Sequence, residues 1–486
     1  MYTNNQKFYI AHAGELPLFL QGKMANRHGL IAGATGTGKT VTLQVIAESF
    51  SQAGVPCFMA DVKGDLSGIS QPGKVNSFIE KRIQEFNLPS EELTFKGCPT
   101  RFFDLFGEQG HPLRTTISAM GPQLLSRLLG LNDTQTGILH IVFEIADKEG
   151  LLLIDTKDLR KMLHYVGQNA KQYTTTYGHI APQSIGAIQR SLLTLEQEGA
   201  TFFFGEPAFD VFDFIQTQEG QGVINLLAAD KLMLSPKLYS TFLLWLLSEL
   251  YTQLPEVGDQ ELPKFVFFFD EAHLLFKDTP KVLIEKIEQV VRLIRSKGVG
   301  VYFITQSPSD IPDSVLAQLG NRVQHALRAY TPKEKKAINT AAQTFRPNPN
   351  FKTEDVISEM GTGEALVSFL DEKGIPGRVE RAKLLFPLSA IGPITKEQRA
   401  ALIKASRLYG RYENYFDRES AYEILSAREE TQSKEEQTIQ KEKRSAPARK
   451  SARQTPFEKA IGSAASSIGR NIGNAIIRTL LGGMKR

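Results

Sequence analysis

Residues 28–41 read HGLIAGATGTGKTV, and this stretch decides the expected fold. A short apolar segment leads into a glycine-rich turn that Lys39 and Thr40 follow directly. In a turn of the pattern GxxxxGK followed by Ser or Thr, backbone N–H groups surround phosphate oxygens, the lysine reaches the β and γ oxygens, and the hydroxyl binds Mg²⁺ at a helix N-terminus. We therefore predict a strand, a phosphate-binding loop (P-loop) and a helix, with these nucleotide-contacting residues: Gly33, Ala34, Thr35, Gly36, Thr37, Gly38, Lys39 and Thr40.

The stretch KFVFFFDEAHLLF, residues 264–276, places two carboxylates at the end of an apolar run. A run this apolar suits a strand that is covered on both faces, with Asp270 and Glu271 at its tip. Asp270 is suited to the Mg²⁺ shell beside Thr40, and Glu271 to orienting and polarising an attacking water. Acidic residues at a strand end also commonly cap a following helix. The P-loop upstream favours the catalytic interpretation.

Two further apolar runs end in polar residues. In GVYFITQSP, residues 300–308, Gln306 is a candidate sensor of the γ-phosphate, and the alternative for Thr305 and Gln306 is hydrogen bonding at the strand end. In CFMADVKGDLSG, residues 57–68, the strand ends with Asp61, Lys63 and Asp65. Asp61 lies either behind the Mg²⁺ site or in a turn.

The stretch LIEKIEQVVRLIRSKGVG, residues 283–300, predicts an amphipathic helix that stops at a glycine. Arg295 and Lys297 close this helix before Gly298. One interpretation is that these cations complement the helix dipole. The other is that Arg295 reaches the γ-phosphate bound to a neighbouring subunit. The expected buried stripe consists of Val282, Leu283, Ile287, Val290, Val291 and Ile294.

Composition predicts a soluble chain of two or three folding units. The 486 residues are 41% hydrophobic and 23% charged, which is typical of globular proteins. No signal peptide and no window of membrane-helix length are recognisable, so we expect a cytoplasmic protein. Cys57 and Cys98 lack metal-ligand spacing, which favours buried reduced thiols.

Charge is unevenly distributed along the chain. Residues 428–486 hold 13 Lys and Arg against 6 Asp and Glu, or +7, which leaves 44 against 47, or −3, for residues 1–427. The body is thus nearly neutral and the tail is basic. A polyanionic partner is compatible with this distribution but not required by it.

Continuous apolar runs alternating with helical patterns predict a parallel α/β sheet. We divide the chain into six parts, with a hairpin expected within 362–388. These are residues 1–110 and 200–390 as the two halves of the sheet domain, 111–199 as a helical insertion, 391–428 as a helical extension, 429–456 as a disordered charged linker, and 457–486 as an amphipathic basic helix. The last helix has three interpretations: docking on a subunit, binding a membrane surface, or binding nucleic acid.

Taken together, these motifs resemble the HerA and FtsK superfamily of ring-forming P-loop ATPases. The stretches that carry the resemblance are GATGTGKT, MADVKGD, FFFDEAHLLF, RSKGVG and FITQSP. Within the superfamily, LLSRLLGLNDTQ, FFFGEP, LLWLLSELYTQLPEVGD and IGRNIGNAIIRTLLG look like a bacterial HerA-like family of poorly assigned role. The resemblance implies a RecA-like (ASCE) core, probable hexamers, and hydrolysis of ATP with Mg²⁺ that moves a polymer, usually DNA, through a central pore.

By position, the resemblance assigns Lys39 and Thr40 to Walker A, Asp270 and Glu271 to Walker B, and Gln306 to the sensor. It places Arg295 where relatives have an arginine that completes a site in trans, with Arg322 as second choice. Archaeal HerA proteins carry a β-barrel that engages a nuclease, whereas here 32 residues precede Gly33. A nuclease partner is therefore not expected.

Three functions compete at this stage. The first is a DNA translocase or helicase, and the second is an ATPase that acts on a protein partner, as in secretion-type relatives. The third, a small-molecule phosphotransferase, is disfavoured because Glu271 and a trans arginine fit attack by water within an oligomer. The sequence does not locate the pore loops of the first two.

Overall fold

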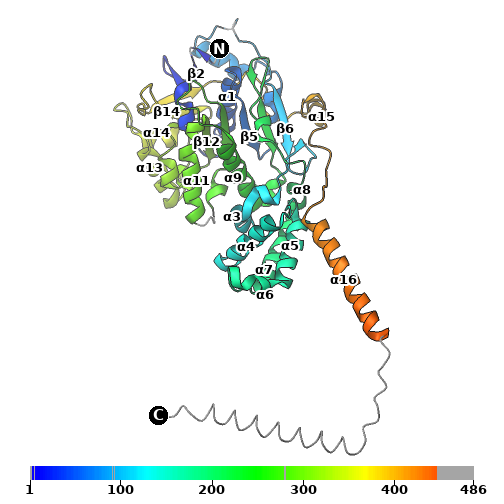
Figure 1. Ribbon diagram of the computed structural model, residues 1–486. Coiled ribbons are helices and arrows are strands. Elements are labelled where there is room, and N and C mark those ends of the chain that lie inside the picture. The colour runs from blue at the N-terminus through cyan, green and yellow to red at the C-terminus, as the bar shows by residue number, and fades with distance from the viewer. Residues whose placement is uncertain (1–2, 5, 90, 92, 278–280, 446–486) are drawn as a thin grey trace, which may run out of the picture. The chain divides into compact units, whose positions relative to one another are not determined.

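The computed structural model describes residues 3–4, 6–89, 91, 93–277 and 281–445. Its contacts divide the chain into a large unit, residues 1–425, and a second unit, residues 426–486. The first unit has an α/β architecture around one large sheet, as the sequence predicts (Figure 1).

Eight neighbouring strands of this sheet are parallel. In spatial order they are β13 (Asn321–His325), β4 (Gly29–Ala32), β12 (Val299–Thr305), β11 (Phe265–Phe269), β5 (Cys57–Asp61), β10 (Ile224–Ala228), β6 (Thr100–Asp104) and β7 (His111–Pro112). The P-loop strand β4 thus lies between β13 and β12. The acidic strand β11 follows one position further along. This parallel core confirms the expected RecA-like class of fold.

The sheet continues beyond β13 with antiparallel strands. β14 (Glu364–Ser368) and β15 (Glu380–Leu384) form the hairpin that the sequence predicts. β15 then pairs with β2 (Lys7–Ala13), which pairs with β3 (Leu16–Gln21) and β1 (Thr3–Asn4). The sequence analysis did not anticipate this N-terminal hairpin. A separate short hairpin joins β8 (Thr217–Gln218) to β9 (Gln221–Gly222).

Both faces of the parallel strands are buried, which explains their continuous apolar runs. In β11, Phe265, Phe267 and Phe269 belong to one hydrophobic core, whereas Val266 and Phe268 belong to the other. This alternation follows from the two-residue period of a strand. Each face therefore needs its own layer of helices.

The layer on the Val266 and Phe268 face contains α1 (Lys39–Gln52), α2 (Ser77–Glu85) and α15 (Lys396–Ala405). The opposite layer contains α3 (Ile117–Leu129), α4 (Asp133–Glu149), α5 (Thr156–Gln168), α7 (Pro182–Leu195), α8 (Thr201–Phe203), α9 (Pro236–Gln253), α10 (His273–Phe276), α11 (Lys281–Ile294) and α12 (Asp313–Leu316), with α6 (Ala170–Tyr177) packed against it. A third small core lies under α13 (Pro332–Gln343) and α14 (Thr353–Glu359).

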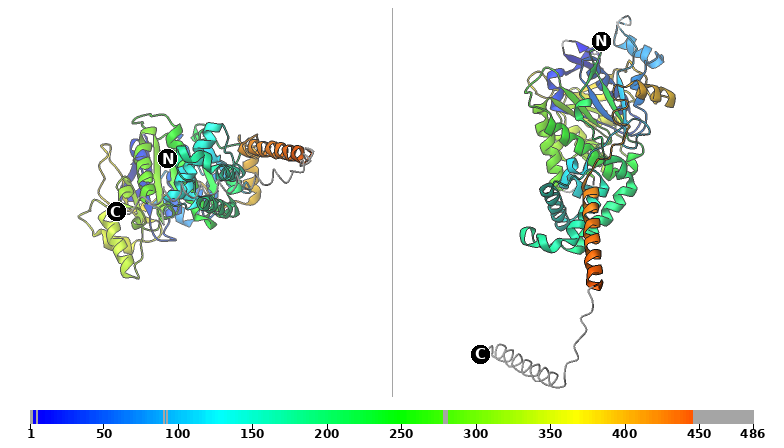
Figure 2. Two further views of the ribbon diagram at one scale, coloured as in Figure 1. Left: turned by 60° about the horizontal axis from the view of Figure 1, so that its bottom comes forward. Right: turned by 45° about the vertical axis from the view of Figure 1, so that its right-hand side comes forward.

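The segment that was expected to be a helical insertion is helical in the structure. Figures 1 and 2 show α4 to α7 gathered as one group. Their apolar side chains, such as Leu139 and Leu163, are continuous with the core beneath the sheet. The boundaries 111–199 of a separate subdomain remain a prediction.

The expectation of a disordered linker from residue 429 is wrong as far as residue 445, because α16 covers Ala421–Ser445. This stretch is rich in Glu, Lys, Gln and Arg, which have high helix propensity even without an apolar stripe. Low hydrophobicity argued against a packed core, but it did not exclude a helix. The rest of the predicted linker and the amphipathic helix at 457–486 lie outside the described residues.

Candidate functional site

The P-loop connects the end of β4 to the first residue of α1 through a backbone that requires glycine. Gly33, Gly36 and Gly38 have φ angles of 153°, 78° and 109°. Residues that carry a Cβ atom rarely adopt such positive φ angles. A Cβ atom on Gly33 would lie 2.5 Å from the Cβ of His325 on β13. The glycines of the motif thus fit both the turn geometry and the close approach of β13.

Lys39 lies inside the loop that it follows. Its Nζ donates hydrogen bonds to the carbonyl oxygens of Gly33, at 2.6 Å, and Ala34, at 3.0 Å. Burial lowers the pKa of Lys39, and the nearby charge of Glu271 opposes this effect. These two carbonyls thus hold the ammonium group of Lys39 within the loop.

Asp270 and Glu271 follow β11 directly, and each has an unusual environment. Burial, reinforced by the charge of Glu271, raises the pKa of Asp270 to about 7. The backbone N–H of Glu271 donates to Asp270 Oδ1 at 2.9 Å, and the Tyr239 hydroxyl donates to the Asp270 carbonyl at 2.9 Å. Glu271 has a φ of 48°, a left-handed conformation that costs a non-glycine residue about 1–2 kcal/mol. Strained residues of this kind cluster at functional sites.

One cavity of about 380 Å³ brings the P-loop and the acidic pair together. Since β4 and β11 are parallel, their carboxyl ends meet at the same edge of the sheet, where nucleotides bind in open α/β folds. The cavity is lined by Thr35, Gly36, Gly38, Lys39, Thr40, Val41, Leu43, Lys63, Asp65, Asp270, Glu271, Ile304 and Thr362. Lys39, Thr40, Asp270 and Glu271 thus line one cavity, whereas the predicted P-loop residues Gly33, Ala34 and Thr37 are not part of its lining.

Three of the weaker candidates lie outside this lining. The carboxylate of Asp61 is buried and accepts a hydrogen bond from Leu66 N–H at 3.3 Å, which matches the turn interpretation. Thr305 donates to Asp310 Oδ2 at 2.8 Å, a strand-end hydrogen bond. Gln306 is exposed just beyond β12, so a sensor role would require its side chain to turn toward the cavity.

The two candidate arginines have different environments. Arg295 precedes β12, whereas the P-loop lies beyond the far ends of the strands, roughly 20 Å away at 3.3 Å per residue. Its side chain is 38% exposed and lies 3.6 Å from Asp259. Arg322 is half-buried, and its guanidinium donates to the backbone carbonyls of Leu316, Leu319 and Thr344. These contacts fit a structural role for Arg322.

Two features that support the P-loop are not evident from the sequence motifs. His325 on β13 is buried, and its Nε2 lies 2.9 Å from the Thr42 hydroxyl of α1. The turn before β14 contacts the loop as well, through Gly363 N–H to the Thr37 carbonyl at 3.2 Å. The pair of glycines around Thr362 was the only sequence signal for this second contact.

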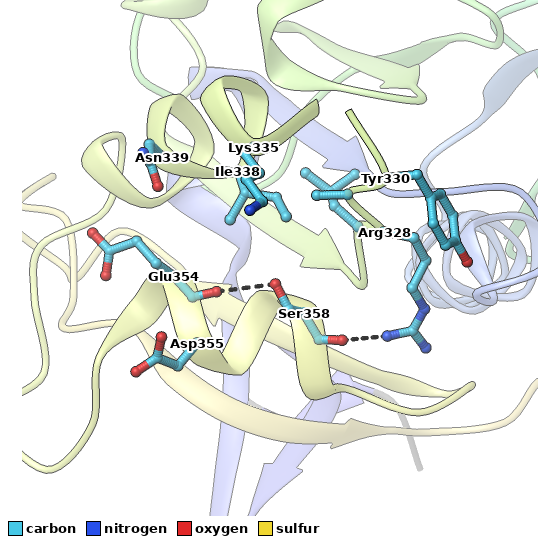
Figure 3. Close-up of a pocket in the computed structure, with 10 residues that line it drawn as sticks. Arg328, Tyr330, Lys335, Ile338, Asn339, Glu354, Asp355 and Ser358 are labelled. Atoms are coloured by element: carbon cyan, nitrogen blue, oxygen red, sulfur yellow. Dashed lines mark hydrogen bonds between the residues drawn. The ribbon is translucent and has the colours of Figure 1, made fainter. Parts of the chain in front are cut away.

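A second cavity, of about 480 Å³, lies between α13, α14 and the loop after β13 (Figure 3). Arg328 and Tyr330 lie at one end of it, and Glu354 and Asp355 extend from α14. The Arg328 guanidinium donates to the backbone carbonyls of Ser358 and Met360 at the end of α14. No residue of the P-loop lines this cavity, so its described lining offers no phosphate-binding loop.

Comparison with known proteins agrees with this geometry. Residues 6–486 match the family described as helicase HerA-like C-terminal. The chain belongs to this HerA-like family. Its members are P-loop ATPases, which is the class that the sequence resemblance implied. A comparison with curated proteins gave no match.

Several solved structures share the fold of this HerA-like chain. The bacterial conjugative coupling protein TrwB, in an unbound form, has 15% identity and a TM-score of 0.52 over 80% of this chain and 93% of its own. TrwB with a non-hydrolysable GTP analogue has 14% identity and a TM-score of 0.52 over 81% and 92%. VirB4 of Thermoanaerobacter pseudethanolicus has 14% identity and a TM-score of 0.50 over 79% and 97%. At these identities the likeness establishes the fold.

Two further features are absent from the described residues. None of their helices has the length and apolar character needed to cross a membrane. No cluster of His, Cys, Asp and Glu in the described part of the chain has the arrangement of a dedicated metal centre.

Proposed function

We propose that this HerA-like chain hydrolyses ATP with Mg²⁺ and uses the reaction to move DNA through a ring of identical subunits. The observation that carries the proposal is the convergence of Lys39, Thr40, Asp270 and Glu271 on one cavity, in a chain whose family is described as helicase-like. TrwB, which has the same fold, has been solved with non-hydrolysable ATP and GTP analogues. This supports the cavity as a nucleotide site.

The chain's own groups divide the work of hydrolysis. The P-loop N–H groups and Lys39 would bind the β- and γ-phosphates, with Lys39 leaving the carbonyls of Gly33 and Ala34. Thr40 and Asp270 would hold Mg²⁺, which neutralises phosphate charge when bound. Glu271 would accept a proton from water as the water oxygen bonds to the γ-phosphorus. The bond from that phosphorus to the bridging oxygen breaks, and ADP leaves with the electron pair.

An oligomeric ring is part of the proposal because an oligomer can supply an arginine to the cavity, whose own cations are Lys39 and Lys63. No arginine is among the described residues that line it. Arg295 lies at the opposite edge of the sheet, so it can reach a γ-phosphate only on another subunit. Trans arginines of this kind stabilise charge that develops during phosphoryl transfer.

To test whether DNA is the polymer that the protein moves, ATP turnover is measured with and without DNA. Single-stranded and double-stranded DNA of equal length are titrated into the wild-type protein, with Glu271→Gln as the matched control. DNA should raise the turnover of the wild type several-fold and leave the control slow. Hydrolysis that no DNA alters would contradict a DNA motor and favour the second interpretation, an ATPase that acts on a protein partner.

A further inference from the structure

Lys63 is the cation that the proposed chemistry leaves without a role. It follows β5 by two residues, in a turn where Gly64 has a φ of 74°. β5 pairs in parallel with β11, with Met59 opposite Phe268, so the turn after β5 lies beside the turn that carries Glu271. Lys63 Nζ is 3.7 Å from Glu271 Oε1, and it lines the same cavity as Lys39.

The other oxygen of Glu271 lies near the imidazole of His273. His273 Nδ1 lies 3.4 Å from Glu271 Oε2. Lys63 and His273 thus flank the two carboxylate oxygens, and the Glu271 side chain is only 13% exposed. A carboxylate held in this way is poorly placed to accept a proton from water.

From these contacts we propose that Lys63 binds the γ-phosphate of ATP and that it leaves its ion pair with Glu271 to do so. The proposal rests on the function proposed above. On binding, the ammonium group exchanges the single charge of Glu271 for the phosphate oxygens, which carry more charge. Oε1 of Glu271 then becomes available to water. Hydrolysis is thereby tied to the presence of a γ-phosphate.

Two observations suit Lys63 to this exchange. Its side chain is 49% exposed, and ion pairs at such exposure are weak, so the pair with Glu271 breaks at little cost. The Lys63 charge also contributes, after burial, to the lowered pKa of Lys39. The two ammonium groups therefore repel each other across the cavity until an anion enters between them.

The test separates contact with the γ-phosphate from simple support of the turn. Affinities for ADP and for a non-hydrolysable ATP analogue, both with Mg²⁺, are measured in the wild type, Lys63→Ala, Lys63→Arg and Lys74→Ala. Lys74 is exposed and does not line the cavity, so Lys74→Ala is the matched control. ATP turnover and thermal unfolding are measured on the same four proteins.

In Lys63→Ala, the preference for the ATP analogue over ADP should fall about tenfold or more, the scale of one hydrogen bond to a charged group. Affinity for ADP should stay near the wild-type value, and turnover should fall. Lys63→Arg should recover part of the preference, because it keeps a cation. Lys74→Ala should match the wild type in every measurement.

An unchanged preference in a folded Lys63→Ala protein overturns the proposal, whether turnover falls or not. A fall in turnover alone would show that Lys63 only positions Glu271. Lys39→Ala and Glu271→Gln distinguish a failure of the proposed role of Lys63 from a failure of the proposed function. If these two variants hydrolyse ATP at the wild-type rate, the proposed function itself fails.

Discussion

Asp270 follows β11, and burial, reinforced by the charge of Glu271, raises the pKa of its carboxyl group to about 7. In the unfolded chain this carboxyl would titrate near the ordinary value of 3.8. Between these values the unfolded chain releases the proton while the folded chain keeps it. The contribution of Asp270 to the free energy of unfolding is thus complete below pH 3.8 and falls as the pH rises to about 7.

We predict that Asp270→Asn stabilises the nucleotide-free protein at pH 8 by about 1–3 kcal/mol, since one unit of pKa shift corresponds to about 1.4 kcal/mol. The amide keeps an acceptor for Glu271 N–H but cannot carry the buried charge. Urea denaturation at pH 5 and pH 8 measures the effect, and the gain over the wild type should shrink at pH 5. The same variant should lose hydrolysis that depends on Mg²⁺. An equal gain at both pH values would refute the assignment of the effect to this carboxylate.

For single residues, the sequence predicted which side chains lie near one another in the site. It did not predict the backbone conformations and ion pairs that hold them there. The spacing of Gly33, Gly38 and Lys39 specifies a P-loop because few other backbones use it. The left-handed φ of Glu271 and the ion pair with Lys63 depend on the packing of β5 against β11. Register between strands distant in sequence is set by the assembled sheet, which a single sequence does not display.

Helix α1 carries Thr40 at its start and is attached to the C-terminal part of the large unit through Glu48. This buried carboxylate accepts hydrogen bonds from Leu388 N–H at 2.9 Å, Ser389 N–H at 3.1 Å and the Ser389 hydroxyl at 2.8 Å. The segment after β15 is therefore fixed to the back of the P-loop helix. Such an attachment keeps α1 in place when its N-terminus binds an anion.

Glu48→Ala should lower the free energy of unfolding by roughly 2–4 kcal/mol, because the donors of Leu388 and Ser389 remain buried without an acceptor. Chemical denaturation in buffer at pH 7 measures this change. Glu80→Ala, at an exposed position of α2, is the control and should stay within about 0.5 kcal/mol of the wild type. A loss no larger for Glu48→Ala than for the control would show that the attachment does not stabilise the unit.

Among the elements, the strands with continuous apolar sequences were predictable. The elements of mixed or charged sequence were not. β4, β5, β11 and β12 are buried on both faces, so their sequences are continuous apolar runs rather than alternating ones. The hairpin of β2 and β3 has mixed composition and gave no comparable signal. In α16, residues with high helix propensity form a helix although most of the segment has no apolar stripe, and its first turns are anchored by the buried Ala421 and Leu425.

At the scale of the whole molecule, a catalytic role for Arg295 requires an oligomer. Within one chain, this arginine and the P-loop lie at opposite edges of the sheet, and Asp259 is its ion-pair partner at 3.6 Å. An exposed pair of this kind contributes little to stability. If Arg295 serves chemistry, a neighbouring subunit must present it.

Arg295→Ala should bind ATP normally and lose roughly 10³- to 10⁵-fold in turnover, the effect of removing a trans arginine. The helix-dipole interpretation predicts instead a loss of about 0.3–1 kcal/mol in stability with turnover retained. Co-assembly separates the two, because Glu271→Gln subunits keep Arg295 and should restore hydrolysis in Arg295→Ala neighbours. Verified mixed rings that show no rescue would argue against the trans role.

The central claim is that one site, built from the P-loop and the end of β11, binds and hydrolyses ATP. The most direct measurement follows ATP binding and phosphate release separately in the wild type, Lys39→Ala and Glu271→Gln. Glu271→Gln should bind Mg-ATP as tightly as the wild type while its turnover falls on the order of 10²-fold or more, the scale of a lost general base. Lys39→Ala should lose both binding and turnover. Wild-type hydrolysis by Glu271→Gln would contradict the claim.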